Sequence, residues 1–173
     1  SLMHGHIHSI DTLSYLLGDP KVTAVRGDLL PRDLKIEDNR LDEDPGATYQ
    51  IEYENGLQAA TVPFPGKWEF EVIGTEGSIR SLNDGQEVLL RKAGSRGRWW
   101  DIAPDPTVKP TSSVVYLLED LVKARESGRP TLGNVDVTHH TTETCLAVAE
   151  SHMKGGAWVD LPLENRDLYV FHV

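Results

Sequence analysis

Short segments of alternating apolar and polar residues, separated by turn-forming residues, fill the middle of the chain. Residues 48–54 alternate strictly, and the apolar members of the series are Tyr49, Ile51 and Tyr53. This period of two is typical of a strand with one buried face and one wet face. The dipeptide Asn55-Gly56 follows and favours a type I′ hairpin turn. Because so short a connection can join only antiparallel neighbours, the pattern predicts an antiparallel meander.

Further segments extend this meander in both directions. We expect strands at residues 21–30, 57–64, 68–74, 78–82 and 87–91, and short final strands at 157–160 and 168–171. A second hairpin signal, Asn83-Asp84-Gly85, separates two of them. Residues 37–46 are acidic and predict a solvated loop, and residues 93–110, rich in Gly, Arg and Pro, predict a long connection.

Helical periodicity is confined to three segments. Residues 8–18, 112–126 and 136–154 place apolar residues three and four apart. Glycine and proline stop signals follow each helix: Gly18 and Pro20, Gly128 and Pro130, Gly155-Gly156. We therefore predict an α+β fold, with an open, mostly antiparallel sheet of about six strands and helices packed on one face. The other face has no obvious cover, which predicts a homo-oligomer through it.

Length, charge and cysteine content limit the classes of partner and the cellular setting that we expect. With 173 residues the chain suits a single domain. A formal net charge of −10 argues against nucleic acid and anionic membrane surfaces as partners. No apolar run approaches the roughly 20 residues that span a bilayer. The single cysteine, Cys145, lies in a predicted helix interior and is expected to be a buried small side chain, which fits a reducing, cytoplasmic setting.

Side chains able to take part in catalysis are concentrated in one segment, His4-Gly5-His6-Ile7-His8-Ser9-Ile10-Asp11. If a helix begins near His8, then Asp11, Thr12 and Tyr15 share its polar face, at three, four and seven residues' distance. Ile10, Leu13 and Leu17 then hold the opposite face in the core. An imidazole beside a carboxylate can take a hydroxyl proton near neutral pH, as the oxidation of an alcohol requires. The hydride must then go to a cofactor, since no side chain accepts one.

Two other interpretations of these histidines stay open. They are surface residues with a helix cap, or they ligate zinc, through His4, His6 and His8 or through His4, His8 and Asp11. The His-x-His of metal-dependent hydrolases usually lies on the first strand of a large barrel, which 173 residues cannot build.

The segment from Gly5 to Gly18, with Val22-Thr23-Ala24-Val25, resembles the "G-x-H-x-x-D … L-L-G … V-x-x-V" opening of a known domain. It is the C-terminal domain of the glucose–fructose oxidoreductase/inositol dehydrogenase/rhizopine-catabolism (Gfo/Idh/MocA) family. Three later segments are similar to the family's "(I/V)-x-G-T-x-G", "G-x-x-P" and "A-x-x-x-S" motifs: Phe70–Ile79, Arg129-Pro130 and Ala147–Ser151. These motifs occur in the family's order and span nearly the whole chain.

The resemblance implies a dihydrodipicolinate-reductase-like C-terminal domain that binds a sugar, polyol or related hydroxy compound and forms oligomers. It implies that His8 and Asp11 are the catalytic residues. We assign substrate contacts to His4, Thr12, Tyr15 and His140, and no metal ligands. NAD or NADP would be bound mainly by an N-terminal Rossmann domain, the chain's expected partner.

The chain departs from the family at two positions and lacks one motif. His4 stands where the polyol dehydrogenases have Asp, and His6 where the family often has Gly. No G-x-G-x-x-G follows a predicted strand. We therefore expect residues 1–173 to be a C-terminal fragment that binds NAD(P) negligibly and is inactive alone. The alternatives are a non-enzymatic binding or regulatory module of the same fold, or a metal-dependent enzyme using His4, His6 and His8.

Overall fold

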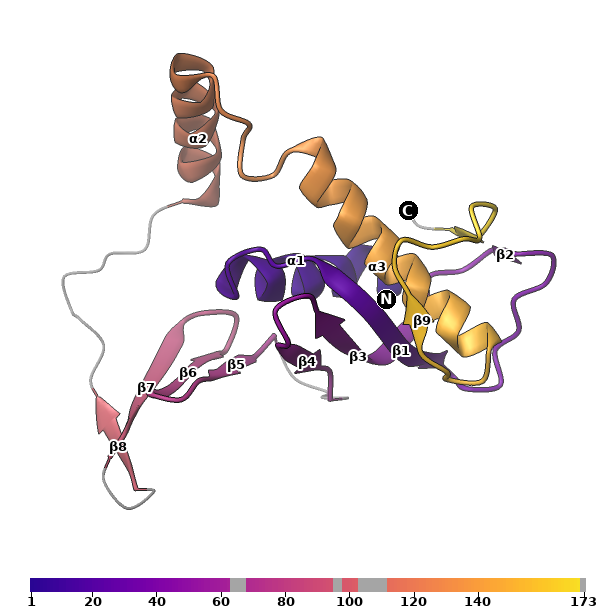
Figure 1. The fold of residues 1–173 in the computed structure, drawn as a ribbon, viewed down its shortest axis with the longest axis horizontal. Helices are drawn as coiled ribbons and strands as arrows, with labels where there is room; N and C mark the ends of the chain where they lie inside the picture. The colour runs from indigo at the N-terminus through magenta and orange to yellow at the C-terminus, as the bar shows by residue number, and fades with distance from the viewer. Residues whose placement is uncertain (63–67, 95–97, 103–111, 172–173) are drawn as a thin grey trace. The chain divides into compact units, whose positions relative to one another are not determined.

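The structure, a computed structural model, describes residues 1–62, 68–94, 98–102 and 112–171 (Figure 1). The chain divides into two compact units. The first combines Ser1–Pro63 with Leu132–Val173, and the second is Phe64–Thr131. The first unit is therefore assembled from two separate stretches of chain.

The described residues of the first unit form three helical elements and six strands. The helical elements are a π-helical turn η1 (Leu2–His6), α1 (Ile7–Leu16) and α3 (Val135–Met153). The strands are β1 (Val22–Leu30), β2 (Arg40–Leu41), β3 (Gly46–Tyr53), β4 (Gln58–Ala60), β9 (Val159–Asp160) and β10 (Tyr169–Val170). Four of them form an antiparallel sheet in the order β4-β3-β1-β9, while β10 pairs with β2 in parallel.

The two faces of this sheet have opposite character. In the β1–β3 register, Val25 lies opposite Ile51 and Leu29 opposite Ala47, and all four side chains are buried. The next pair along, Arg26 and Gln50, points to the other face and is exposed. Helix α3 packs along β1, and α1 packs on α3 (Figure 1). The predicted half-buried strand is thus confirmed, and the helices cover the apolar face.

A glycine sets the close approach of α3 to this sheet. A Cβ atom added at Gly27 would lie 2.4 Å from the Thr48 carbonyl oxygen and 3.0 Å from Cγ1 of Val148 on α3. The Gly27 N–H donates to Oγ of Ser151, at 2.9 Å. The small residues of α3 that the sequence predicted for this contact, among them Ala147, are fully buried.

The two hairpin signals form different turns. Of the pair Asn55-Gly56 only the glycine has positive φ, at +82°, whereas a type I′ turn needs positive φ at both positions. The Gly56 N–H bonds to the Tyr53 carbonyl, so a tight turn ends in a left-handed glycine and makes a three-residue loop. The second hairpin instead has positive φ at three successive positions: Asn83 (52°), Asp84 (55°) and Gly85 (80°). The sequence located both hairpins correctly but was wrong about the turn type of the first.

The second unit has its own antiparallel sheet. Its strands, in spatial as in chain order, are β5 (Phe70–Ile73), β6 (Gly77–Leu82), β7 (Glu87–Ala93) and β8 (Trp99–Ile102). Strand β8 corrects the prediction of a featureless connection at 93–110, because its residues pair with β7. Residues 95–97 and 103–110 of that connection, and residues 63–64 at the end of the strand predicted for 57–64, lie outside the described residues.

Helix α2 (Ser113–Ser127) belongs to the second unit and ends as predicted. Gly128 adopts a left-handed conformation, φ 73°, and its N–H bonds to the Ala124 carbonyl. The apolar stripe is exposed rather than buried, since four of its side chains are between 42% and 57% exposed: Val115, Leu118, Leu121 and Val122.

The fold class is as predicted, with helices packed on antiparallel strands. The difference lies in the sheets, since the described strands form two four-stranded sheets and a two-stranded pair rather than one sheet of about six strands. Cys145 is fully buried as expected, and burial raises the pKa of its thiol to about 12. Within the described ranges, no helix is long and apolar enough to cross a bilayer.

Candidate active site

Helix α1 presents most of the predicted site residues on one surface. His8, Asp11 and Tyr15 are exposed, and Thr12 is half-buried. The opposite side is anchored in the core by Ile10, which is fully buried. The predicted amphipathic arrangement is present at Ile10, whereas Leu13 and Leu17 are only partly buried. The helix begins one residue earlier than expected, ends at Leu16 and is preceded by a π-helical turn.

The π-helical turn carries His4 to the same surface. Its bonds run over five residues, from the His6 N–H to the Ser1 carbonyl and from the Ile7 N–H to the Leu2 carbonyl. The His4 and His8 rings meet edge to face, with their centroids 6.4 Å apart and their planes at 84°. Such wide turns are frequent at functional sites in helices. Here it brings two imidazoles together at the start of α1.

His6 points elsewhere. Its Nε2 accepts a hydrogen bond from the Ala47 N–H of β3 at 3.3 Å, and its ring packs edge-on against Tyr49 with centroids 5.4 Å apart. Burial lowers the pKa of His6, and the nearby N-terminal ammonium lowers it further. A ring nitrogen that accepts from a backbone N–H is committed to that bond, so His6 does not join His4 and His8. Among the residues described, no group of three or more His, Cys, Asp or Glu side chains is arranged to hold a metal ion.

Asp44 is part of this region, although the acidic composition of residues 37–46 predicts a solvated loop. One carboxylate oxygen accepts from the Met3 N–H at 2.7 Å, and the other from the His4 N–H at 3.0 Å. The prediction for residues 37–46 is corrected in a second respect, because the segment also contains β2. The Asp44 contacts have no local signal in the sequence, since the partners of Asp44 lie about 40 residues away. The same holds for β2, whose partner strand is β10.

His140 has a structural bond of its own. Its Nε2 accepts from the Val22 N–H at 2.8 Å, which ties α3 to the start of β1. Burial lowers the pKa of His140, and nearby Glu143 partly opposes the shift. The nitrogen that accepts this bond is engaged by the backbone of β1, so any substrate contact of His140 would have to use the rest of its ring.

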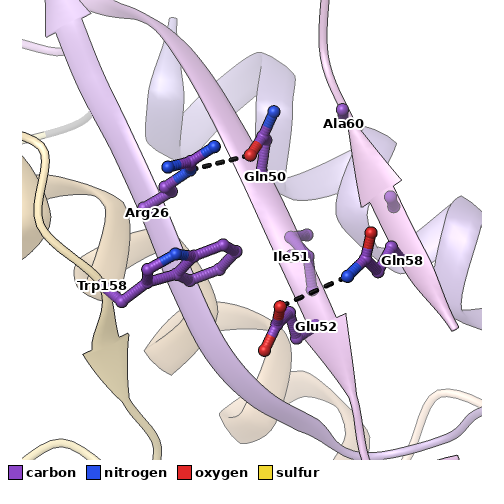
Figure 2. Close-up of a pocket in the computed structure, with 8 residues that line it drawn as sticks. Arg26, Gln50, Ile51, Glu52, Gln58, Ala60 and Trp158 are labelled. Carbon is purple, nitrogen blue, oxygen red and sulfur yellow. Dashed lines mark hydrogen bonds between the residues drawn. The ribbon is translucent and has the colours of Figure 1, made fainter. Parts of the chain in front are cut away.

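A second group of polar residues lies on the open face of the first sheet, in a hollow of about 390 Å³ (Figure 2). The Arg26 Nε donates to Oε1 of Gln50 at 2.7 Å, and its guanidinium lies 5.0 Å from the centre of the Trp158 ring. Nε2 of Gln58 donates to Oε1 of Glu52 at 3.3 Å. The hollow was not predicted from the sequence, although the polar side of the alternating segment 48–54, with Gln50 and Glu52, was the signal for it.

The two groups differ in what they can do chemically. The α1 surface combines imidazoles with a carboxylate and hydroxyls, the groups that move protons. The hollow pairs its charges and amides with one another and lies on the opposite face of the sheet from α1 and α3. The α1 surface is therefore the candidate active site.

Side-chain caps occupy two of the described helix starts, the turn that leads into α1 and the start of α3. The first turn leading into α1 is capped by the Asp44 carboxylate. The α3 start is capped by Asn134, whose side chain accepts from the Asp136 and Val137 N–H groups, and Asp136 adds a negative charge there. A phosphate bound by a helix start needs free N–H groups and a positive end. At these two starts the capped N–H groups are therefore not free to bind a phosphate.

Comparison with protein families gives one match of nearly full length. Residues 1–161 match the family described as "Oxidoreductase family, C-terminal alpha/beta domain", the C-terminal domain of the Gfo/Idh/MocA proteins. No curated protein sequence is similar enough to the chain to be matched.

Several solved structures share the fold. An NADPH-dependent oxidoreductase, so described, from Desulfitobacterium hafniense has a TM-score of 0.71 at 19% identity, with 92% of this chain and 47% of that one covered. An aldose–aldose oxidoreductase from Caulobacter crescentus, complexed with glycerol, has a TM-score of 0.64 at 20% identity, covering 90% and 45%. A levoglucosan dehydrogenase, in complex with NADH and levoglucosan, has a TM-score of 0.64 at 23% identity, covering 92% and 50%. The chain thus spans about half the length of these structures. Together with the family match, this identifies the chain as a member of the Gfo/Idh/MocA oxidoreductase family, corresponding to its C-terminal α/β domain.

Proposed function

We propose that the chain is the substrate-binding and oligomerisation domain of an NAD(P)-dependent dehydrogenase that acts on a sugar, polyol or related hydroxy compound. The observation that carries the proposal is the exposed α1 surface, where His8 and Asp11 lie one helical turn apart beside His4. Family membership supports oxidoreductase chemistry, and relatives of the same fold were solved with glycerol and with levoglucosan.

In this proposal His8 takes the proton of the substrate hydroxyl while a hydride leaves the carbon that bears it. The nicotinamide, when bound, supplies the hydride acceptor. Asp11, three residues along the helix, stabilises the imidazolium that forms. His4, Thr12 and Tyr15 bind the remaining hydroxyls of the substrate from the same surface, and His140 on α3 adds a contact through the part of its ring that does not bond to Val22.

We also propose that NAD or NADP is held mainly by a separate Rossmann domain in the same polypeptide. The support is that the chain covers about half of the length of its relatives and that side chains already cap the turn before α1 and the start of α3. The fragment alone would then bind NAD(P) negligibly and be inactive. We place the parent enzyme in the cytoplasm, where a lone buried thiol such as Cys145 stays reduced.

The test uses the parent enzyme with NAD(P) and a panel of polyols and sugars. His8→Asn removes the proposed base and should lower kcat by about 10²- to 10⁴-fold. His139→Asn, an exposed histidine on α3, is the matched control and should leave kcat unchanged. Full activity in His8→Asn would overturn the role of His8. A parent that binds sugars but oxidises none of them would favour a non-enzymatic binding module.

We further propose that a homo-oligomer forms through an open apolar sheet face. In the second unit a row of cross-strand neighbours shares one face: Val72, Ile79, Leu90 and Ile102. Ile79 is 53% exposed. Ile79→Lys should reduce the mass measured by light scattering to that of a monomer, whereas Leu89→Lys, on the opposite face, should not. A monomeric wild-type protein at micromolar concentration would refute the proposal.

A further inference from the structure

The helix start that carries His8 is held from the side opposite the active surface. Leu2 and Ile10 are fully buried, and they fix the turn and the helix in the core. The Cys145 thiol also donates a weak hydrogen bond to the Leu2 carbonyl, at 3.9 Å, so the first residue of the turn is tied to α3. Two further polar contacts lie closer to the histidine pair, one through Asp44 and one through His6.

The Asp44 contact fixes the backbone of the turn. Its two carboxylate oxygens accept from the successive N–H groups of Met3 and His4, at 2.7 and 3.0 Å. The first N–H groups of a helix have no partner within the helix, and a negative charge is favourable at that end. A carboxylate that accepts hydrogen bonds from two successive N–H groups satisfies both donors and also fixes the direction of the turn.

The His6 contact fixes the turn against the sheet. His6 lies between His4 and His8 in sequence, and its ring reaches the Ala47 N–H and the edge of Tyr49, both on β3. The acceptor nitrogen must be unprotonated, so the ring is neutral with its proton on Nδ1. Burial favours this neutral form. The two flanking imidazoles, His4 and His8, are thereby turned outward together.

We propose that Asp44 and His6 are positioning residues that set the His4–His8 pair in the orientation the active surface needs. The significance for catalysis rests on the proposed function of His8. The positioning itself follows from the contacts above and is measured without substrate or cofactor. In this proposal His6, which stands where the family often has Gly, has a positioning role and takes no part in proton transfer.

The test is nuclear magnetic resonance on the 173-residue chain and its variants. In the wild type, ring protons of His4 and His8 should show a nuclear Overhauser effect, since the centroids are 6.4 Å apart and the rings meet edge to face. Asp44→Ala should abolish it and speed hydrogen exchange at the Met3 and His4 amides about fivefold, the equivalent of one helix cap. Asp42→Asn is the control, from the same loop, with an exposed carboxylate paired to Arg40.

His6 is tested with two variants. His6→Gln keeps an acceptor within reach of the Ala47 N–H and should retain the His4–His8 effect, while His6→Ala should lose it. Each is measured well below its melting temperature, with the α3 resonances confirming a folded core. If Asp44→Ala and His6→Ala are folded and keep the His4–His8 effect, the residues are merely stabilising and the inference is overturned. If both alanine variants lose the His4–His8 effect while the wild-type parent enzyme oxidises no substrate, the positioning is upheld and the proposed function is refuted.

Discussion

Removing the hydroxyl of Tyr49 should make the protein more stable. Tyr49 is 3% exposed, and its hydroxyl has no hydrogen-bond partner among the described residues. Burial raises the pKa of this phenol well above its ordinary value, with smaller contributions from Cys145 and Tyr53. The hydroxyl therefore stays protonated and its desolvation is uncompensated.

The magnitude follows from what Tyr49→Phe keeps and what it removes. The aromatic ring stays, with its edge contact to His6 and its place opposite Gly27 in the β1–β3 register. What disappears is one buried hydroxyl without a partner, which costs about 1–3 kcal/mol. A gain of about 2 kcal/mol corresponds to a rise in Tm of roughly 4–8 °C for a protein of this size.

The assay is thermal unfolding by circular dichroism, checked by urea denaturation. Tyr169→Phe is the control, because Tyr169 is 43% exposed and its hydroxyl loses little water on folding. Its Tm should match the wild type. A lower Tm in Tyr49→Phe would refute the reasoning, since it would mean that the hydroxyl is satisfied in the folded protein by an internal water.

Three further predictions concern packing, pH and capping. Gly27→Ala should cost about 3 kcal/mol, because the added methyl meets backbone at 2.4 Å, whereas Gly133→Ala, with nothing within 4 Å, should be close to neutral in urea denaturation. The pKa values of His6 and His140 are lowered from 6.5 by burial, so the unfolded chain takes up protons first on acidification. The free energy of unfolding should therefore fall as pH drops below about 6.5, and a His6→Gln variant should show a weaker fall in urea titrations at several pH values. Asn134→Ala should lower the free energy of unfolding by about 1 kcal/mol through loss of the α3 cap, and Asn134→Asp should preserve it; equal losses in both variants would argue against capping.

The elements that the sequence predicted well are those whose signal is local. Tyr49, Ile51 and Tyr53 alternate with polar residues, and that alternation alone fixes which face of β3 is buried. The amphipathic spacing of α1 likewise placed Ile10 in the core and His8 outside. The period of two residues in a strand, and of 3.6 residues in a helix, determines which side chains share a face.

The parts that escaped prediction depend on contacts between distant segments. Nothing near Asp44 in the sequence shows that its carboxylate caps a turn 40 residues earlier, so an acidic run was interpreted as a solvated loop. His6 resembled its neighbours His4 and His8 in sequence, and only the packing of β3 separates it from them. The paired strand β8 was missed because its short segment is bounded by Gly, Arg and Pro residues that favour turns.

The division of the first unit between two stretches of chain has a consequence for synthesis. The apolar face of β1, with Val25 and Leu29, is covered by α3, which is translated more than 100 residues later. A nascent chain that ends at residue 131 therefore exposes this face throughout the synthesis of the second unit. Contacts of such long sequence separation fold slowly, and exposed strands of this kind aggregate. Chaperone binding to ribosome-held intermediates should accordingly persist until Val148 and its neighbours on α3 emerge and close the core.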